Sequence, residues 1–322
     1  MKLLKLIPDN TNIKFLRWRV PFYAVSLLLM AASIGLVMTK GLNLGVDFVA
    51  GQMVRATFAE PVAPLAEVRE EVDALGYGEP IIQQLGDPNQ IAIRMKLPEG
   101  GEVGLADQMV REIRTTIEQN HPGVQIGAAR SVSGKVSDEL FETGMIALLL
   151  ASIGISIYIW VRFEWQFGVG AMFALVHDVT LTLGLFSITQ MEFDLNIVAA
   201  LLTLIGYSLN DNIVIYDRIR ENLKKYRKMP LPELLDLSVN ETLSRTIVTT
   251  TSLLITLVSL LVLGPDVIFG FTAAITFGIF VGTYSSVFMS TPILIWLGVT
   301  SDSFVPVESR ADAQDRKARG GA

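Results

Sequence analysis

Long uninterrupted apolar runs, rather than alternating apolar and polar positions, dominate the pattern of this 322-residue chain. A helix crosses a bilayer with about 20 mostly apolar residues, and six runs come close to that length or exceed it. One long stretch, between the first and second runs, contains no such segment. The predicted membrane helices cover 20–38, 143–161, 166–189, 195–216, 246–263 and 267–298.

The stretch 40–142 shows a mixed pattern of strands and helices instead. Residues 52–59 alternate between polar and apolar positions, as a half-buried strand does. Pro64 begins a segment with acidic residues in its first turns, which favours a helix N-terminus. The predicted elements are strands at 52–59, 80–85, 90–97 and 124–132 and helices at 64–75 and 103–120. This βαββαβ order is typical of a ferredoxin-like sandwich, so we predict six membrane helices with an inserted α+β domain.

Three further segments complete the chain. The basic start, 1–19, and the apolar run after it are arranged as in a signal peptide, but no A-x-A-like cleavage site follows, so we expect a retained helix. The polar segment 217–245 is expected to form a cytoplasmic amphipathic helix-turn-helix. The charged tail, 300–322, is expected to be disordered. The last span is longer than a bilayer needs, which predicts a tilt or a kink near Pro292.

Composition supports a membrane protein. Hydrophobic residues make up 51% of the chain and charged residues 18%, whereas soluble domains are about 25% charged. Cysteine is absent, which excludes disulfides and thiolate metal sites. The two histidines, His121 and His177, make a multi-histidine metal site unlikely to form, so we expect no metal and no other cofactor.

The distribution of basic residues predicts the orientation. The stretch 40–142 holds 16 acidic and nine basic residues, which gives it a charge of −7. The other 17 basic residues all fall on one side, at the N-terminus, at Arg162, between 218 and 245, and in the tail. The loops 190–194 and 264–266, on the opposite side, hold none. Because basic loops stay cytoplasmic, we expect cytoplasmic termini and a periplasmic domain at 40–142, in a bacterial inner membrane.

A carboxylate interrupts the fourth apolar run. Asn210, Asp211 and Asn212 lie within it, and the apolar residues 213–215 resume after them. An ionisable side chain inside a span is costly and is a functional hypothesis by default. The alternative is that the span ends early and Asp211 lies among the headgroups. The resumption of the run favours the first interpretation.

Two other helices carry spaced polar or small residues. On the fifth, one face holds Arg245, Thr249, Ser252, Thr256 and Ser259. Such a stripe is expected to face other helices or water, although each hydroxyl could instead bond the carbonyl four residues earlier. The sixth helix has small residues at every fourth position, which indicates close helix packing rather than chemistry. These are Gly270, Ala274, Gly278, Gly282, Ser286 and Ser290.

The third helix places Asp178 near mid-span, beside His177. A structural carboxyl and a proton relay are both open for Asp178. Asp211 and Arg245 both lie near the cytoplasmic ends of their helices, so they could share one depth. An ion pair there would keep the carboxylate ionised, and separation or water access would let it take up a proton.

Four motifs together resemble those of one family. GYSLNDNIVIYDRIREN at 206–222 resembles the helix-four signature of the SecF family, within the resistance-nodulation-division superfamily. ETLSRT at 241–246 is similar to its helix-five entry, ALVHD at 174–178 to its helix-three motif, and GLNLGVDF at 41–48 to the motif after its first helix. The resemblance covers 12–298 and departs at 49–52, where VAGQ replaces the usual TGGT.

The resemblance implies a subunit, not an enzyme, that uses the proton motive force to help preproteins leave the Sec channel. Its implied partners are SecD, the SecYEG channel, the translocating preprotein and the lipid bilayer, with YajC and YidC as further candidates and no nucleic acid. Asp211 and Arg245 match the family's membrane-embedded proton-pathway pair. The expected pathway residues are Asp211, Arg245, Asp178, Asn210, Thr249 and Ser252.

Three alternatives remain at this point. A half-transporter of the same superfamily could export a small molecule or a lipid, although such proteins usually carry two six-helix halves. An intramembrane aspartyl protease could use Asp178 and Asp211 as its dyad, but the usual Gly-x-Gly-Asp context is missing around Asp211. A purely structural assembly factor would not need Asp211 and Arg245 to be chemically intact.

Overall fold

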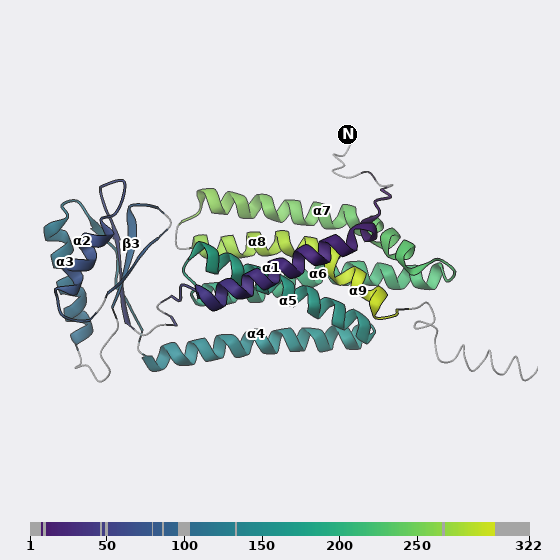
Figure 1. Ribbon diagram of the computed structural model, residues 1–322, viewed down its shortest axis with the longest axis horizontal. Coiled ribbons are helices and arrows are strands. Elements are labelled where there is room, and N and C mark those ends of the chain that lie inside the picture. The colour runs from purple at the N-terminus through teal and green to yellow at the C-terminus, as the bar shows by residue number, and fades with distance from the viewer. Residues whose placement is uncertain are drawn as a thin grey trace, which may run out of the picture. The chain divides into compact units, whose positions relative to one another are not determined.

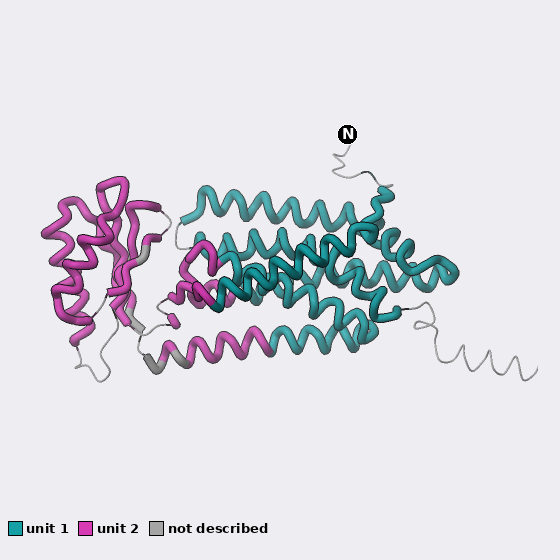
Figure 2. The backbone as a smooth tube through the Cα atoms, in the orientation of Figure 1, with its two compact units in different colours: residues 1–38, 150–185, 200–322 teal, residues 39–149, 186–199 magenta. Residues whose placement is uncertain are grey.

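The chain folds into two compact units, shown in teal and magenta in Figure 2. Unit 1 comprises Met1–Met38, Leu150–Leu185 and Ala200–Ala322, and unit 2 comprises Thr39–Leu149 and Phe186–Ala199. The computed structural model describes residues 8, 11–45, 47–48, 51–78, 80–85, 87–95, 104–132, 134–265 and 268–299. The tail 300–322, most of 1–10, and the first two residues of the departure at 49–52 lie outside this part of the chain.

Unit 2 contains an antiparallel sheet with two helices on one face (Figure 1). Its strands follow the order β2-β3-β1-β4, with β5 also paired to β1. This is the order of a split-βαβ sandwich, except that the single last strand predicted at 124–132 is two short strands. The elements are β1 (Gly51–Thr57), α2 (Leu65–Asp73), β2 (Ile81–Gln84), β3 (Gln90–Met95), α3 (Leu105–Asn120), β4 (Gln125–Ile126) and β5 (Arg130–Val132).

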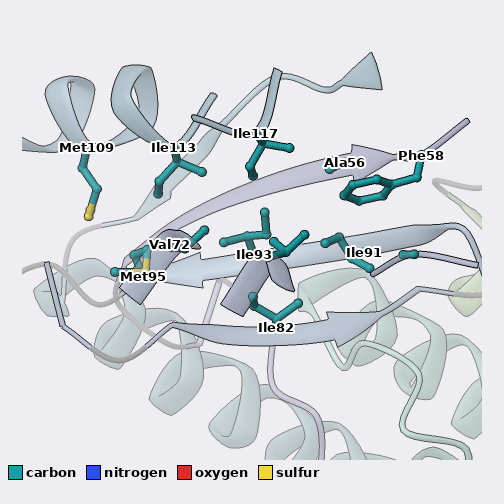
Figure 3. Packing of buried hydrophobic residues seen from close by; sticks show 12 residues of the cluster. Ala56, Phe58, Val72, Ile82, Ile91, Ile93, Met95, Met109, Ile113 and Ile117 are labelled. Carbon is teal, nitrogen blue, oxygen red and sulfur yellow. The ribbon is translucent and has the colours of Figure 1, made fainter. Parts of the chain in front are cut away.

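The core of this sandwich lies between the helices and the sheet. Met109, Ile113 and Ile117 recur every four residues on α3, so they share one helix face and are fully buried. Figure 3 shows them directed at the sheet, where Ile91 and Ile93 alternate with residues of the opposite face. On that opposite face Met53 and Ala92, with Leu85 beside them, form a smaller buried cluster. The sheet is therefore covered on both faces.

The membrane part is six helical segments long and apolar enough to span a bilayer, counted over the described residues. Their bounds are α1 (Arg19–Thr39), α4 (Gly134–Arg162), α5 (Trp165–Thr189), α6 (Leu195–Lys225), α7 (Leu231–Leu263) and the consecutive α8 (Phe269–Ser285), η3 (Ser286–Ser290) and α9 (Thr291–Trp296). A short helix, η1 (Phe15–Trp18), precedes α1. In α5, α6 and α8–α9, 56% of the span is buried, against 17% or less elsewhere. Helices α5, α6 and α8–α9 therefore contribute most of the buried interior.

The predicted fold class of six membrane helices and an α+β domain is confirmed, while several helix ends differ from the predictions. Helix α4 begins at Gly134 rather than at 143, so its first turns carry the polar residues assigned to the domain. Helix α6 continues to Lys225, and α7 begins at Leu231. The segment 217–245 is a helix-turn-helix as expected, but its two helices are the continuing ends of α6 and α7 and not separate elements. Polar residues extend a helix beyond the apolar run when they keep helical propensity.

The last segment departs from regular α-helix close to the residue where a kink was predicted. Residues Ser286–Ser290 form a π-helical turn immediately before Pro292. Proline cannot donate a backbone hydrogen bond and clashes with the carbonyl four residues earlier, so a wider turn relieves that conflict. The Thr291 hydroxyl donates to the Ser286 carbonyl oxygen at 2.8 Å, which satisfies one acceptor in this turn.

Candidate functional site

The candidate site is built on the helical hairpin of α6 and α7. Asn222, buried on α6, donates hydrogen bonds to Ser238 Oγ at 3.0 Å and to Glu241 Oε2 at 2.7 Å, both on α7. These contacts place the two helices side by side near their connecting turn. Counted along the sequence, Asp211 is as far from the end of α6, at Lys225, as Arg245 is from the start of α7, at Leu231. The Asn222–Ser238 and Arg218–Glu241 contacts, however, pair each α6 residue with an α7 residue further from the turn, so Arg245 lies about one helical turn nearer the connecting turn than Asp211.

Asp211 is buried in unit 1, with 3% of its surface exposed. Its Oδ2 atom has no hydrogen-bond partner among the described residues. Two other buried atoms of this hairpin share this condition: Tyr207 OH, one turn earlier on α6, and Thr246 Oγ1, beside Arg245 on α7. Buried polar groups are nearly always hydrogen-bonded, so these three buried atoms without a hydrogen-bond partner need an explanation, which can be a functional one.

Arg245 is the cation whose charge acts on Asp211. The ion pairs within 4.0 Å in the described part of the chain do not join the two residues, although they include the neighbouring pair Arg218–Glu241 at 3.8 Å. Arg245 lies exposed on the surface of unit 1. The hairpin therefore holds a buried carboxyl and a guanidinium within electrostatic reach but not in contact.

The polar stripe on α7 faces away from the chain's own helices. Arg245, Thr249, Ser252, Thr256 and Ser259 are all exposed. Thr249 and Ser259 each donate to the carbonyl oxygen four residues earlier, at 3.0 and 2.8 Å. Local bonding thus satisfies hydroxyls of this stripe, which was the simpler interpretation of the sequence pattern. It cannot satisfy a guanidinium, so Arg245 is the member of the stripe that needs an external partner.

Helix α6 adds exposed positions along one side. Four exposed residues follow one another at steps of three, four and seven, which keeps them on one side of the helix. They are Thr203, Gly206, Asn210 and Asp217. Asn210 therefore points away from the buried position of its neighbour Asp211. A hydrophobic span normally presents apolar side chains to lipid, so these α6 positions and the α7 stripe suit a protein partner better than lipid tails.

Asp178, on α5, lies in a different environment. Its Oδ2 accepts hydrogen bonds from Ser208 Oγ of α6 at 2.6 Å and from Ser285 Oγ of α8 at 2.9 Å. Its Oδ1 lies 3.0 Å from Nδ1 of His177. Both residues are almost fully buried. The Asp178 carboxyl thereby links α5, α6 and α8 through its contacts with His177, Ser208 and Ser285.

Residues of the last span extend this buried polar cluster. The Asn212 side chain donates to the Ser208 carbonyl oxygen at 3.1 Å and accepts a hydrogen bond from Ser290 Oγ. Ser290 belongs to the π-helical turn, a feature often found at functional positions. The sequence pattern assigned the small residues of this span to packing alone. The hydroxyl of Ser290 has its partner, Asn212, on α6, which a single-helix pattern cannot reveal.

The structure therefore separates the predicted pathway residues into two groups. Asp211 and Arg245 belong to the α6–α7 hairpin and lie within electrostatic reach of each other, with Asn210, Thr249 and Ser252 at exposed positions of the same two helices. Asp178 belongs to the enclosed cluster with Ser208 and Ser285. Among the described residues no hydrogen bond joins the two carboxyls, whereas a protease dyad shares one proton at about 3 Å.

The sequence comparisons match this chain to one group of proteins. A family described as protein export membrane protein SecD/SecF, C-terminal, matches residues 112–300. The protein translocase subunit SecF of Rhodobacter capsulatus is 43% identical over 307 residues, which cover 92% of each chain. The protein translocase subunit SecF of Pseudomonas aeruginosa is 38% identical over 307 residues, covering 95% of this chain and 98% of its own.

A solved structure is similar in fold as well as in sequence. The crystal structure of SecDF, a translocon-associated membrane protein from Thermus thermophilus, matches with a TM-score of 0.82 and 32% identity. The match covers 91% of this chain and 39% of that one. The chain studied here thus spans well under half the length of that protein.

Proposed function

Because this chain belongs to the SecF family and is a subunit of the Sec protein-export machinery, we propose that it uses the proton motive force to promote preprotein translocation and release on the periplasmic side. The observation that carries the proposal is the buried Asp211 carboxyl, whose Oδ2 has no hydrogen-bond partner among the described residues and which lies within electrostatic reach of Arg245. The family is one of translocase subunits, so the work is movement rather than covalent catalysis.

The proposed cycle uses Asp211 as a reversible proton acceptor. Arginine stays charged at any physiological pH, so the carboxyl is the group that switches. Contact with Arg245 favours the carboxylate, whereas separation in an apolar environment favours the protonated acid. A proton that enters from the periplasm while the groups are apart is released to the cytoplasm when they meet. Each passage thereby moves α6 against α7.

The exposed polar positions of α6 and α7 are the proposed contact surface for SecD. The solved relative, SecDF, is a chain of which this one covers 39%, which supports a partner that supplies the remaining helices. Asn210, Thr249 and Ser252 would then line a pathway closed by both subunits. SecYEG and the preprotein are proposed as further partners, with YajC and YidC as accessory ones.

The proposed location is the bacterial inner membrane, with cytoplasmic termini and a periplasmic α+β domain. Its support is the placement of 17 basic residues on one side of the six spans. The chain has no cysteine, so single cysteines report position cleanly. A cysteine at Gln84 should react with an impermeant thiol reagent in intact spheroplasts and one at Lys224 should not. The opposite labelling would overturn the orientation.

Proton-gradient-dependent preprotein export in membrane vesicles tests the function. Asp211→Asn keeps size and polarity but cannot titrate, so we expect export to lose its response to the gradient. The matched control is Asp73→Asn, which makes the same change at an exposed position of α2, outside the proposed contact surface. Insertion and partner binding are verified separately for each variant. Export by assembled Asp211→Asn at the wild-type rate, with the same response to an uncoupler, would refute the acceptor role.

A further inference from the structure

An ionic cluster in unit 2 links the sheet to the turn between α5 and α6. Glu192, in that turn, lies 3.3 Å from Arg55 of β1 and 3.3 Å from Arg94 of β3. The side chains of Arg94 and Glu192 are only 9% and 11% exposed. Both strands are central in the sheet, so the cluster holds the middle of the sheet and not an edge. The export mechanism described above makes no use of it.

Arg94 also contacts the segment that follows α1. Its Nη1 donates to Asn43 Oδ1 at 3.0 Å and to the Leu44 carbonyl oxygen at 2.5 Å. That segment pairs with the same turn through its backbone, since Gly45 N donates to Phe193 O at 2.8 Å and Phe193 N donates to Asn43 O at 2.7 Å. Arg94 therefore contacts the strand segment after α1 and the α5–α6 turn at once.

The close fit at Gly45 explains one residue of the motif at 41–48. A Cβ atom at this position would lie 2.9 Å from Asp194 Cβ and 3.1 Å from Glu192 Oε1. Contacts below 3.0 Å force a neighbour to move, so a side chain here would displace the turn that carries Glu192. Glycine thus permits the approach that places Glu192 within reach of both guanidinium groups.

The ionic cluster combines charge with one hydrogen bond to Glu192, which Arg55 Nη2 donates to Glu192 Oε2 at 3.3 Å. Among the described residues Arg94 Nε, Arg94 Nη2 and Glu192 Oε1 are buried without a hydrogen-bond partner. Burial lowers the pKa of the Arg94 guanidinium and the charge of Glu192 opposes that shift, so the arginine remains a cation. Coulomb attraction falls off slowly with distance, whereas a hydrogen bond weakens steeply with angle. Such a contact can change its geometry and still transmit force.

We propose that Glu192, through Arg94 and Arg55, is a positioning residue that makes the outer domain follow movement of the α5–α6 turn. The turn is continuous with α6, which carries Asp211, so the inference rests on the proposed proton-driven function. Without the charge of Glu192, the helices would still move with proton uptake, but the sheet would follow them poorly. Proton flow and export would then become uncoupled.

Two substitutions at Glu192 separate charge from shape. Glu192→Gln keeps the shape and one acceptor oxygen but removes the charge, whereas Glu192→Asp keeps the charge on a shorter side chain. In proteoliposomes that contain the full chain with its export partners, we expect Glu192→Gln to lower gradient-stimulated export about tenfold, a modest value for loss of one member of a buried ion pair. Glu192→Asp should retain most of the stimulation. The matched control is Glu118→Gln, which removes the same charge from an exposed pair with Arg114.

Proton uptake by the same proteoliposomes distinguishes this proposal from the function on which it rests. Asp211→Asn should lose both proton uptake and stimulated export, whereas Glu192→Gln should lose only the second. Wild-type behaviour of Asp211→Asn would refute the proposed function. Stimulated export by Glu192→Gln at the wild-type level, or equal loss in Glu192→Gln and Glu192→Asp, would overturn the positioning role. Loss of proton uptake in Glu192→Gln would also overturn it.

A distance measurement tests the positioning role even if export is lost for another reason. Spin labels at Asp87 and Asn196, both exposed, report on the sheet and on the start of α6 in unit 2. We expect one narrow distance distribution in the labelled parent and in Glu118→Gln, and a broad one in Glu192→Gln. A distribution that stays equally narrow in assembled Glu192→Gln would overturn the proposal.

Discussion

Asp178 and Asp211 are both carboxyls buried in the membrane part of one chain, yet their surroundings differ. Asp178 accepts hydrogen bonds from Ser208 and Ser285, on two other helices, and lies against His177. Asp211 has an oxygen without a hydrogen-bond partner among the described residues, and its cation, Arg245, lies on exposed surface. The first carboxyl is enclosed by its own chain, while the second lies next to a surface that another subunit can cover.

This difference indicates which of the two can change its state. Releasing Asp178 would leave several buried donors unsatisfied, and each buried orphan costs about 1–3 kcal/mol. No side-chain hydrogen bond to Asp211 is found among the described residues. The difference supports the proposed proton-accepting role of Asp211 and agrees with a role for Asp178 in holding α5, α6 and α8 together. Burial alone, which the two share, does not separate them.

The largest effect is expected at Arg245. Arg245→Met removes the charge that favours ionised Asp211, and we expect gradient-dependent export to fall about 100-fold, near the upper end of coupling between sites. Arg245→Lys keeps the charge and loses the planar fork, so its loss should be closer to about tenfold. Export rates in vesicles, with and without an uncoupler, measure both. Equal activity of the two variants would show that the charge of Arg245 is not what matters.

Asp178 should affect stability rather than coupling. Asp178→Ala leaves Ser208 and Ser285 without their acceptor, and we expect the free energy of unfolding in detergent to fall by about 3 kcal/mol. Asp178→Asn retains an acceptor oxygen and should cost about half as much. Assembled Asp178→Asn should still respond to the proton gradient. If it were stable but unresponsive, the distinction between the two carboxyls would fail.

Two glycines compare the packing of the enclosed region with that of the open surface. A Cβ atom on Gly184, on α5, would lie 2.1 Å from Ser33 Oγ and 2.5 Å from Ser33 Cβ of α1. Gly184→Ala should therefore lower the free energy of unfolding by about 1–3 kcal/mol. At Gly206, on α6, nothing lies within 4 Å of the added atom, so Gly206→Ala is the matched control. Thermal unfolding in detergent should show a lower midpoint only for Gly184→Ala.

The smallest effect is expected at a carboxyl outside the membrane. Hydrogen bonds from Gln108 and Tyr77 lower the pKa of Glu112 in the outer domain. A carboxyl with a lowered pKa stabilises the folded state above its unfolded pKa, and that contribution is lost as the pH falls through the folded value. The isolated domain should therefore melt at a slightly lower temperature below pH 4 to 5. Tyr77→Phe should reduce this dependence, and an unchanged pH profile would contradict it.

The sequence by itself determined the fold class, and it identified the candidate site residues. Apolar runs long enough to span a bilayer indicate membrane helices wherever they occur, because no water is present there to satisfy an irregular backbone. Alternation and turn residues likewise predicted the βαββαβ order of elements along the outer domain. Asp211 was identified because a charge inside an apolar run is rare. Each of these patterns involves residues that are close together in the chain, so a single sequence is sufficient to detect it.

Only the tertiary structure decided which groups meet. The partners of Asp178 come from α6 and α8, and Glu192 lies against Arg55 and Arg94, which are far from it in sequence. It also decided that the stripe headed by Arg245 faces outward, since periodicity shows that residues share a face but not what that face contacts. Helix ends in polar sequence, such as that of α6 at Lys225, were settled by packing against α7 rather than by hydropathy. Such contacts join residues that are far apart in the sequence. The local pattern around each residue does not show which distant residue it will meet.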